Sequence, residues 1–217
     1  HALLLASRGC KVVVNDLGGA VDGTGGSSSA ADQVVAEIKA KGGEAVASYD
    51  SVSEAAAAAD IVKTATDAFG RVDILVNNAG ILRDKTFAKM TIAEFREVVD
   101  VHLMGSVVCT KAVWEIMRQQ RHGRVLMTTS SSGLFGNFGQ ANYGAAKMAL
   151  VGLMQTLSLE GEKYDIRVNC LAPTAATAMT DGLLGEDASA RLAPELVSAG
   201  LLALVGDDAP TRAILCA

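Results

Sequence analysis

The sequence predicts an α/β fold, with residues 1–217 forming a single domain around a doubly wound parallel sheet. Short apolar runs rich in β-branched residues alternate with longer segments of helical periodicity, which is typical of this class. One helix separates successive strands in the first half, and such connections join parallel strands by right-handed crossovers. The chain has 217 residues, 50% of them apolar and 20% charged, which is enough for one sizeable core.

The first half of the chain contains three predicted strands. Residues 1–8 resemble the end of a helix that Gly9 closes, without a cap or a preceding strand, so we expect an upstream segment to be missing. Strands are expected at residues 11–16, 44–49 and 73–77. Helices are expected at residues 29–41 and, with Ser53 as N-cap and Gly70 as its end, at residues 53–69.

The second half continues the alternation of helices and strands. The run Thr91-Ile-Ala-Glu94 has the capping-box pattern, which predicts a long helical region to about residue 120. Further helices are expected at about 142–162 and from Pro194, which suits a first helical turn, to near 206. Strands are expected at 124–129, 166–171 and 212–217. The last run stops abruptly, so we expect the C-terminus to be clipped as well.

Composition narrows the classes of function. The net charge of -5 argues against nucleic acid or an anionic membrane surface as the main partner. The four cysteines are far apart, without metal-site or disulfide spacing, so we expect reduced thiols and no metal site. No apolar run approaches the length of a membrane span, and the start does not resemble a signal peptide. We therefore expect a soluble intracellular protein.

The chemistry of the chain is expected between residues 130 and 147. Tyr143 and Lys147 are four residues apart in a predicted helix, so they share a face and can approach one bound molecule. A nearby ammonium lowers the pKa of a phenol from about 10, which would make Tyr143 a usable acid or base. Ser130, at the end of the preceding strand, could donate a hydrogen bond to a developing oxyanion. Each piece alone more often has a structural role.

Polar residues and turn residues recur where the predicted strands end, at Asp16, Asp50, Asn77, Ser130 and Pro173. In open parallel sheets, ligands bind at the carboxyl ends of the strands. A carboxylate at Asp16 can accept both ribose hydroxyls of an adenosine and would repel a 2′-phosphate, which favours NAD over NADP. A role in forming a turn is the alternative for these acids and for the asparagine run.

Three motifs together resemble the short-chain dehydrogenase/reductase family. They are Asn77-Asn-Ala-Gly80, a serine at 130 thirteen residues before Tyr143, and the pair Tyr143-x-x-x-Lys147. The segments 14–19, 77–84 and 136–143 are more closely similar to the (3R)-hydroxyacyl-CoA dehydrogenase region of type 2 peroxisomal multifunctional enzymes. The likeness extends from about residue 11 to residue 180, and it implies a Rossmann-like fold.

The resemblance also implies roles for individual residues. Tyr143 would take the hydroxyl proton as a hydride leaves for the nicotinamide, Lys147 would lower its pKa and hold the nicotinamide ribose, and Ser130 would orient the substrate oxygen. The cofactor would be NAD. Its remaining contacts would come from residues at the strand ends: Asp16 at the adenosine ribose, Ser51 and Val52 at the adenine, Asn77 and Ala79 along the groove, and Ala175 and Thr177 beside the nicotinamide.

The chain departs from the family pattern in three places. The first strand and its glycine-rich phosphate loop are absent from this chain, so no residues for pyrophosphate binding are visible. His102 occupies the place of an asparagine that is catalytic in many members, and it could be a core histidine or part of a proton relay. Thr174 follows Pro173 where glycine is common, which alters the loop on the nicotinamide side.

The leading hypothesis is an NAD-dependent oxidoreductase for a small-molecule secondary alcohol or ketone, with 3-hydroxyacyl-CoA as the first substrate to consider and a hydroxysteroid as another. The alternative is a truncated, non-catalytic copy that binds a nucleotide or acts as a scaffold. The apolar helices around Trp114 and Leu150 resemble surfaces that family members bury in homodimers and homotetramers, and a core face is the alternative. We expect no nucleic acid or membrane partner, and a cytoplasmic or, in a eukaryote, peroxisomal location.

Overall fold

The computed structural model describes residues 1–19, 29–175 and 192–217. Its strands are β1 (Val12–Asn15), β2 (Ala45–Ser48), β3 (Ile74–Asn77), β4 (Gly123–Thr128), β5 (Ile166–Ala172) and β6 (Ile214–Cys216). Its α-helices are α1 (Ala2–Ser7), α2 (Ser29–Ala40), α3 (Ala55–Phe69), α4 (Ile92–Val99), α5 (Gly105–Gln120), α6 (Ser131–Phe135), α7 (Ala141–Gly161) and α9 (Pro194–Val205). A π-helical turn, Asp100–Met104, joins α4 to α5, and a 3-10 turn, Glu162–Tyr164, follows α7.

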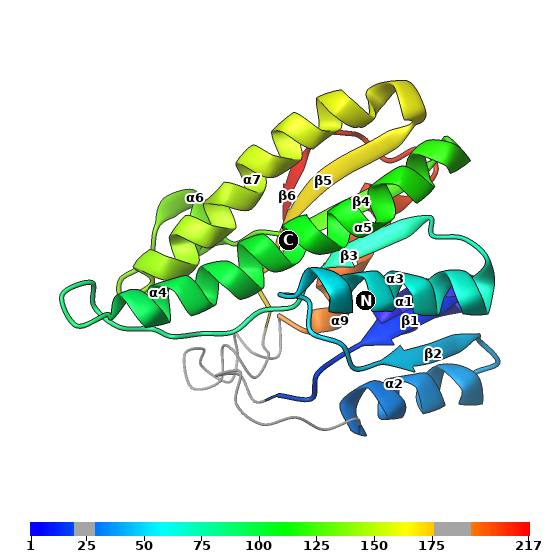
Figure 1. Ribbon diagram of the computed structural model, residues 1–217, viewed down its shortest axis with the longest axis horizontal. Coiled ribbons are helices and arrows are strands. Elements are labelled where there is room, and N and C mark those ends of the chain that lie inside the picture. Colours follow the sequence, from blue (N-terminus) through cyan, green and yellow to red (C-terminus); the bar gives the residue numbers. More distant parts are fainter. Residues whose placement is uncertain (20–28, 176–191) are drawn as a thin grey trace.

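All strand pairs are parallel, which confirms the predicted α/β class. β1 pairs with β2, and β3, β4, β5 and β6 form a second ladder in that order (Figure 1). The two ladders are separate in the described residues, because no ladder joins β1 to β3 there. Val12 of β1 and Ile74 and Val76 of β3 instead pack against one apolar cluster that includes Leu5 of α1.

Helices cover both faces of the larger ladder, because successive side chains along its strands point alternately into two apolar cores. Val125 and Met127 of β4 pack with α5 and α7, which run side by side across one face (Figure 1). Leu126, between them, points the other way into a cluster with Leu201 of α9. α3 contributes Val62 to the first core, whereas α2 packs its buried residues on the β1–β2 pair. The arrangement is the doubly wound one.

Most predicted elements are present with small shifts at their ends. Thr91 and Glu94 form the capping box that opens α4, and Pro194 lies at the start of α9. The N-cap of α3 is Glu54, so the prediction of Ser53 is wrong, and Ser53 instead donates its backbone N–H to Ser51. The helix α6 was not predicted, because the segment between residues 130 and 140 has the glycines and serines of a loop. Residues 20–28 of the predicted loop lie outside the described residues.

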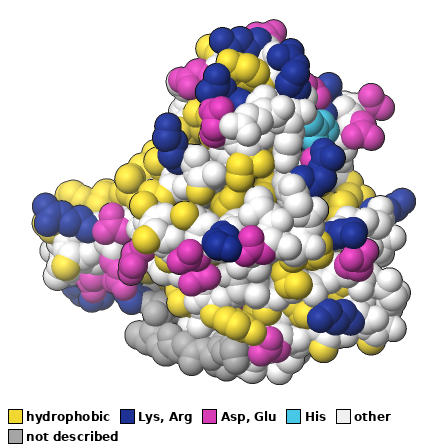
Figure 2. All heavy atoms as spheres, turned by 45° about the vertical axis from the view of Figure 1, so that its right-hand side comes forward, with side chains coloured by type: hydrophobic (Ala, Val, Ile, Leu, Met, Phe, Trp, Pro, Cys, Tyr) yellow, Lys and Arg dark blue, Asp and Glu magenta, His cyan; other side chains and the backbone are white. Residues whose placement is uncertain are grey.

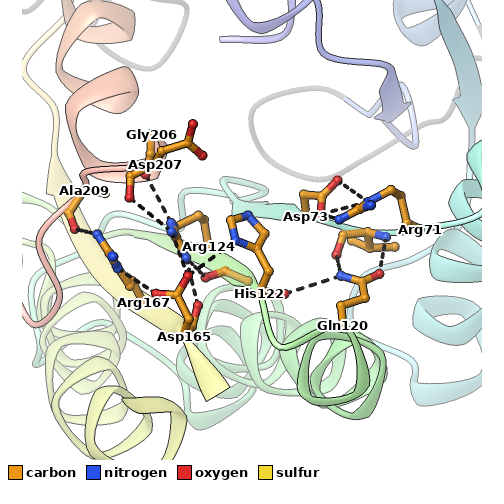
Figure 3. Close-up of polar contacts among 12 residues, drawn as sticks. Arg71, Asp73, Gln120, His122, Arg124, Asp165, Arg167, Gly206, Asp207 and Ala209 are labelled. Atoms are coloured by element: carbon orange, nitrogen blue, oxygen red, sulfur yellow. Dashed lines mark hydrogen bonds and ion pairs between the residues drawn. The ribbon is translucent and has the colours of Figure 1, made fainter. Parts of the chain in front are cut away.

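A polar network closes the amino ends of β4 and β5 (Figure 3). Arg124, only 2% exposed, donates to the backbone oxygens of Gly123, Asp165, Gly206 and Asp207 and to the carboxylate of Asp165. Arg167 donates to the same carboxylate and to the Ala209 carbonyl. Burial raises the pKa of the Asp165 carboxyl, but the hydrogen bonds and charges of the two arginines outweigh it and leave that pKa below its ordinary value.

The surface carries charges of both signs. On the face shown in Figure 2, acidic and basic side chains are interspersed with apolar ones. All four cysteines are free thiols, and Cys109 and Cys170 are buried. Within the described ranges, no helix is long and apolar enough to cross a bilayer. The same ranges contain no group of three or more histidines, cysteines or acids that could hold a metal ion.

Candidate active site

The predicted site residues follow the carboxyl ends of the strands, which share one edge in a parallel sheet. Asp16 follows β1, Ser51 follows β2, Asn77 ends β3, and Ser130 comes two residues after the end of β4. Asn15 exchanges hydrogen bonds with the backbone of Asp50, at 3.1 Å to its oxygen and 3.2 Å from its nitrogen, which ties the first two strand ends together. The polar residues that follow β1 and β2 are therefore held next to each other.

Ser130 is the N-cap of α6. Its hydroxyl oxygen accepts the Ser132 backbone N–H at 3.2 Å, and the side chain is 9% exposed. The cap fixes the rotamer of Ser130, and hydrogen bonding between its hydroxyl and the Tyr143 phenol lowers the pKa of Tyr143. The structure thus brings two of the three predicted catalytic residues into contact.

Tyr143 lies in the first turn of α7, with Lys147 one turn further along. The Lys147 ammonium nitrogen is 5.5 Å from the Tyr143 ring centroid, so the predicted common face is correct. The direction of the predicted pKa shift is wrong. Burial raises the pKa of Tyr143 and the Asp84 carboxylate adds to that effect, so the net shift is upward despite Ser130.

Lys147 is buried, with 3% of its surface exposed. Its ammonium donates to the Thr128 carbonyl oxygen at 2.5 Å. Burial lowers the pKa of Lys147 to about 7, so its charge changes near neutral pH. A lysine whose charge is this labile is typical of functional sites.

His102 lies in the π-helical turn and is 2% exposed. Its Nε2 is 2.8 Å from the Ile81 carbonyl oxygen and 3.1 Å from the Ile81 nitrogen, and its ring meets the Tyr143 ring edge-on at 5.1 Å. Burial, together with the charge of Lys147, lowers the pKa of His102 to about 3, so the imidazole is neutral. Of the two alternatives, this favours the core histidine.

Gly80, the last residue of the Asn77–Gly80 motif, has no room for a side chain because it lies against the His102 ring. A Cβ atom at Gly80 would lie 2.2 Å from the His102 Cε1 atom, far inside van der Waals contact. The Nδ1 atom of His102 is buried and has no hydrogen-bond partner in the part of the chain that the structure describes. A buried nitrogen without a partner beside Tyr143 leaves this corner of the site able to bind a water or ligand atom.

The residues that were expected to contact the cofactor differ in their exposure to solvent and in their packing. Asp16 is exposed, and one of its carboxylate oxygens accepts the Gly18 N–H at 2.6 Å. This hydrogen bond fixes the orientation of the Asp16 side chain in the turn that follows β1. Ala79 is exposed as well, and Ser51 is half-buried. Val52 packs against Gly105 at the start of α5, where an added Cβ would lie 3.0 Å from Val52. An open carboxylate with small or apolar neighbours fits an adenosine ribose and base.

Two further residues that were expected to contact the cofactor have other contacts in the structure. A third lies outside the described residues. The Asn77 amide donates inward to Thr110 Oγ1 at 3.1 Å and to the Met127 sulfur at 3.3 Å, so it anchors β3 and does not face a groove. Ala175 packs partly buried against the apolar cluster behind β5. Thr177 lies outside the described residues.

Sequence reasoning missed three residues of the site, namely Asn142, Thr129 and Gly133. Asn142, fully buried, donates to the Arg83 carbonyl at 3.2 Å and accepts the Tyr143 N–H at 2.7 Å. Thr129, also fully buried, donates its hydroxyl to the Lys147 carbonyl oxygen at 2.7 Å. Asn142 and Thr129 are polar and directly precede Tyr143 and Ser130, which was the available signal for them, whereas Gly133 has no such signal in the sequence.

A separate hollow of about 570 Å³ lies at the far ends of α5 and α7. It is lined by Trp114, Arg118, Leu159, Glu160, Glu162, Lys163 and Tyr164, and it contains none of the predicted site residues. Leu150 is 1% exposed and belongs to the core, so for this residue the core face is the correct one of the two alternatives.

Comparisons with known proteins agree with this geometry. The model of a family described as short chain dehydrogenase matches residues 2–187. A relative from Mycobacterium tuberculosis, named as a short-chain type dehydrogenase/reductase, is 57% identical over 91% of this chain and 69% of its own length. The peroxisomal hydratase-dehydrogenase-epimerase of Saccharomyces cerevisiae is 57% identical over 91% of this chain, which spans 22% of that protein.

A solved structure extends the comparison to three dimensions. The full-length peroxisomal multifunctional enzyme type 2 of Drosophila melanogaster matches with a TM-score of 0.80 and 38% identity, over 100% of this chain and 35% of that one. The chain is therefore similar to one part of these larger proteins.

Proposed function

Because the chain belongs to the short-chain dehydrogenase family, and is therefore an oxidoreductase that acts on CH–OH groups, we propose that it transfers a hydride between NAD and a 3-hydroxyacyl-CoA. Members of this family use NAD or NADP, and they act on small molecules. The proposal adds the choice of NAD, the substrate class and the role of each residue.

One observation supports this reaction above all others: Ser130, Tyr143 and Lys147 meet at the carboxyl end of β4. The Ser130 side chain is near enough to the Tyr143 phenol to lower its pKa, and the Lys147 ammonium lies 5.5 Å from the centre of the Tyr143 ring. A hydroxyl that orients an oxygen, a phenol that exchanges its proton and an amine that favours the phenolate when it is protonated are the parts that oxidation of an alcohol needs.

In the proposed mechanism, Ser130 holds the substrate oxygen and Tyr143 takes the hydroxyl proton. The nicotinamide, when bound, would accept the hydride. Because burial places the pKa of Tyr143 above its ordinary value, the phenol is protonated at neutral pH. Oxidation needs the phenolate, so its rate is expected to rise with pH on the alkaline side, whereas ketone reduction is expected to slow.

The proposed cofactor is NAD because Asp16 is an exposed carboxylate at the end of β1. Ser51, Val52 and Ala79 would border the adenosine, Asn77 would support the groove from behind, and Ala175 and Thr177 would approach the nicotinamide. A 2′-phosphate near Asp16 would meet like charge, which opposes NADP.

The substrate proposal depends on the relatives. The words hydratase-dehydrogenase-epimerase and multifunctional enzyme occur in the names of proteins that match 91% and 100% of this chain. Their peroxisomal names also support a peroxisomal location in a eukaryotic cell, and we propose a cytoplasmic one otherwise. We further propose that residues 1–217 form a single oxidoreductase domain and act as a homodimer or homotetramer.

The proposed subunit contact lies on α5 and α7, where large apolar side chains are exposed. Met104, Met148 and Leu159 are 41%, 49% and 61% exposed on or next to these helices. Exposed apolar side chains on neighbouring helices favour burial against another protein surface. Light scattering on the purified protein would test this, and a monomer at micromolar concentration would contradict it.

A substrate screen tests the proposed function. The purified protein would be mixed with NAD or NADP and with (3R)-hydroxyacyl-CoAs, hydroxysteroids or small secondary alcohols, and reduced nicotinamide would be followed by absorbance. We expect the highest kcat/KM with NAD and a hydroxyacyl-CoA. Preference for a hydroxysteroid would overturn the substrate class, and NAD binding without any turnover would support the non-catalytic alternative.

A further inference from the structure

Lys147 is held at two points by consecutive residues of one strand end. Its ammonium donates to the Thr128 carbonyl oxygen at 2.5 Å, and its own carbonyl oxygen accepts the Thr129 hydroxyl at 2.7 Å. Thr129 is in turn fixed to β5, because its backbone N–H donates to the Leu171 carbonyl at 2.8 Å. The backbone and the side-chain tip of this lysine are thus both attached to the sheet.

The Thr129 bond is additional to the helix. In an α-helix the carbonyl of residue i already accepts the N–H of residue i+4, and each carbonyl oxygen has a second lone pair. Lys147 lies in the first half of the 21-residue helix α7, so its carbonyl does not need Thr129 in order to be satisfied. The extra bond therefore sets where the helix sits against β4.

Gly133 of α6 allows a close approach to the backbone of α7 at Lys147. A Cβ at Gly133 would lie 2.9 Å from the Lys147 Cβ and 3.0 Å from both the Lys147 carbonyl carbon and the Met148 nitrogen. The short helix α6 therefore lies directly on the backbone of α7 at Lys147. Any side chain at this position would push α6, with its N-cap Ser130, away from α7.

We propose that Thr129 and Gly133 are positioning residues, which hold the backbone of α7 so that the Lys147 ammonium stays between Thr128 and the Tyr143 ring. The proposal rests on the proposed function of Tyr143 and Lys147. Because Lys147 is 3% exposed, a shift of its backbone cannot be taken up by solvent around the ammonium. Catalytic geometry is sensitive to displacements of about 1 Å.

The test compares Thr129→Val, which keeps the shape and removes the hydroxyl, with Thr129→Ser, which keeps the hydroxyl. Ser158→Ala is the matched control, because Ser158 is a buried hydroxyl on the same helix that donates to the Gln155 carbonyl at 2.8 Å. For each variant, kcat/KM for NAD-dependent oxidation is measured across pH. The titration of Lys147 is followed by NMR of ¹³Cε-labelled lysine without cofactor, and the signal is assigned by its absence in Lys147→Met.

Thr129→Val is expected to lower kcat/KM by about 10- to 100-fold, whereas Thr129→Ser should stay within about threefold of the unaltered protein. The unaltered protein should show a Lys147 pKa of about 7, and in Thr129→Val that pKa should move up toward the ordinary value of 10.5 as the side chain gains solvent. Ser158→Ala should match the unaltered protein in both measurements.

The proposal is overturned if Thr129→Val keeps both the rate and the Lys147 titration of the unaltered protein. An equal loss in Thr129→Ser or in Ser158→Ala would overturn it too, since the effect would then reflect general packing. If Thr129→Val does not fold, Gly133→Ala is expected to give the same upward shift of the Lys147 pKa, and an unchanged pKa there would be contradictory. The titration needs no substrate, so it decides this question even if no turnover is found and the proposed function fails.

Discussion

The two edges of the parallel sheet hold their buried cations in different ways. At the amino ends of β4 and β5, Arg124 is 2% exposed and donates to four backbone oxygens and one carboxylate (Figure 3). At the carboxyl end of β4, Lys147 is 3% exposed and its ammonium has one hydrogen bond among the described residues, to Thr128. Similar burial is therefore combined with very different numbers of partners.

The difference separates stability from reactivity. A fully satisfied network is rigid and holds the chain in one arrangement, and Arg124 in this way fixes the loop that leads to β6. At the other edge, Lys147 and His102 have pKa values lowered to about 7 and about 3, and the His102 Nδ1 atom has no partner among the described residues. Buried groups that lack partners and have shifted pKa values are typical of binding and catalytic sites.

The largest expected effect is on the catalytic rate, and it concerns the carboxyl ends of the strands, where Tyr143 lies. Tyr143→Phe removes the proton carrier and keeps the ring that packs edge-on to His102. We expect kcat to fall by about 10²- to 10⁴-fold, which is the usual share of general acid–base catalysis. Affinity for NAD, measured by calorimetry, should remain within a few fold of the unaltered value. Turnover close to that of the unaltered protein would exclude Tyr143 as the acid or base.

The second effect is on the stability of the fold, and it concerns the amino ends of β4 and β5, where Arg124 lies. Arg124→Met leaves the Asp165 carboxylate and several carbonyl oxygens without their partner, so the free energy of unfolding should fall by about 3 to 5 kcal/mol. Urea denaturation measures this change. Arg124→Lys keeps the charge but not the forked geometry and should lie between the two. The contrast between the edges would fail if Arg124→Met left stability unchanged or lowered kcat per folded molecule as much as Tyr143→Phe does.

Much of the fold was predictable because it depends on local patterns. The Thr91–Glu94 capping box and Pro194 at the start of α9 were recognised from short motifs. The short helix α6 was not, since its helical conformation depends on packing against α7 at Gly133 and on the Ser130 cap, both of which are invisible before the chain is folded.

The same distinction applies to the site. The spacing of Tyr143 and Lys147 predicted a shared face correctly, because helical geometry alone determines it. The direction of the Tyr143 pKa shift was predicted wrongly, because desolvation depends on how much of the chain surrounds the phenol. The inward turn of the Asn77 amide depends on Thr110 in α5, which no pattern around residue 77 could indicate.

A third, smaller effect concerns cofactor choice at the exposed part of the carboxyl edge. Asp16→Ala removes the charge that would repel a 2′-phosphate, so the ratio of kcat/KM for NAD to that for NADP should narrow by about tenfold, equivalent to about 1.4 kcal/mol. Steady-state kinetics with both cofactors measure the ratio. If the unaltered protein already prefers NADP, the role assigned to Asp16 is wrong.

The smallest effect is the pH dependence contributed by Asp165. Its pKa is lower in the folded protein than the ordinary value, so its stabilising contribution is complete above about pH 4 and is lost as the pH falls through the lower, folded-state value. Because the side chain is 43% exposed, we expect about 1 kcal/mol or less. Asp165→Asn should lower stability at neutral pH and flatten this acid dependence, and an unchanged acid slope would show that other carboxyls cause it.

The most direct test of the central claim is the pH dependence of a single turnover. Hydride transfer from a hydroxyacyl-CoA to NAD would be followed by stopped flow, while ionisation of Tyr143 is followed in the same protein by ultraviolet difference absorption, with Tyr143→Phe as the blank. The expected result is that the rate rises with pH in step with the tyrosine signal that disappears in Tyr143→Phe. A rate that is independent of pH over that range, or that follows a group still titrating in Tyr143→Phe, would contradict the assignment of Tyr143 as the base.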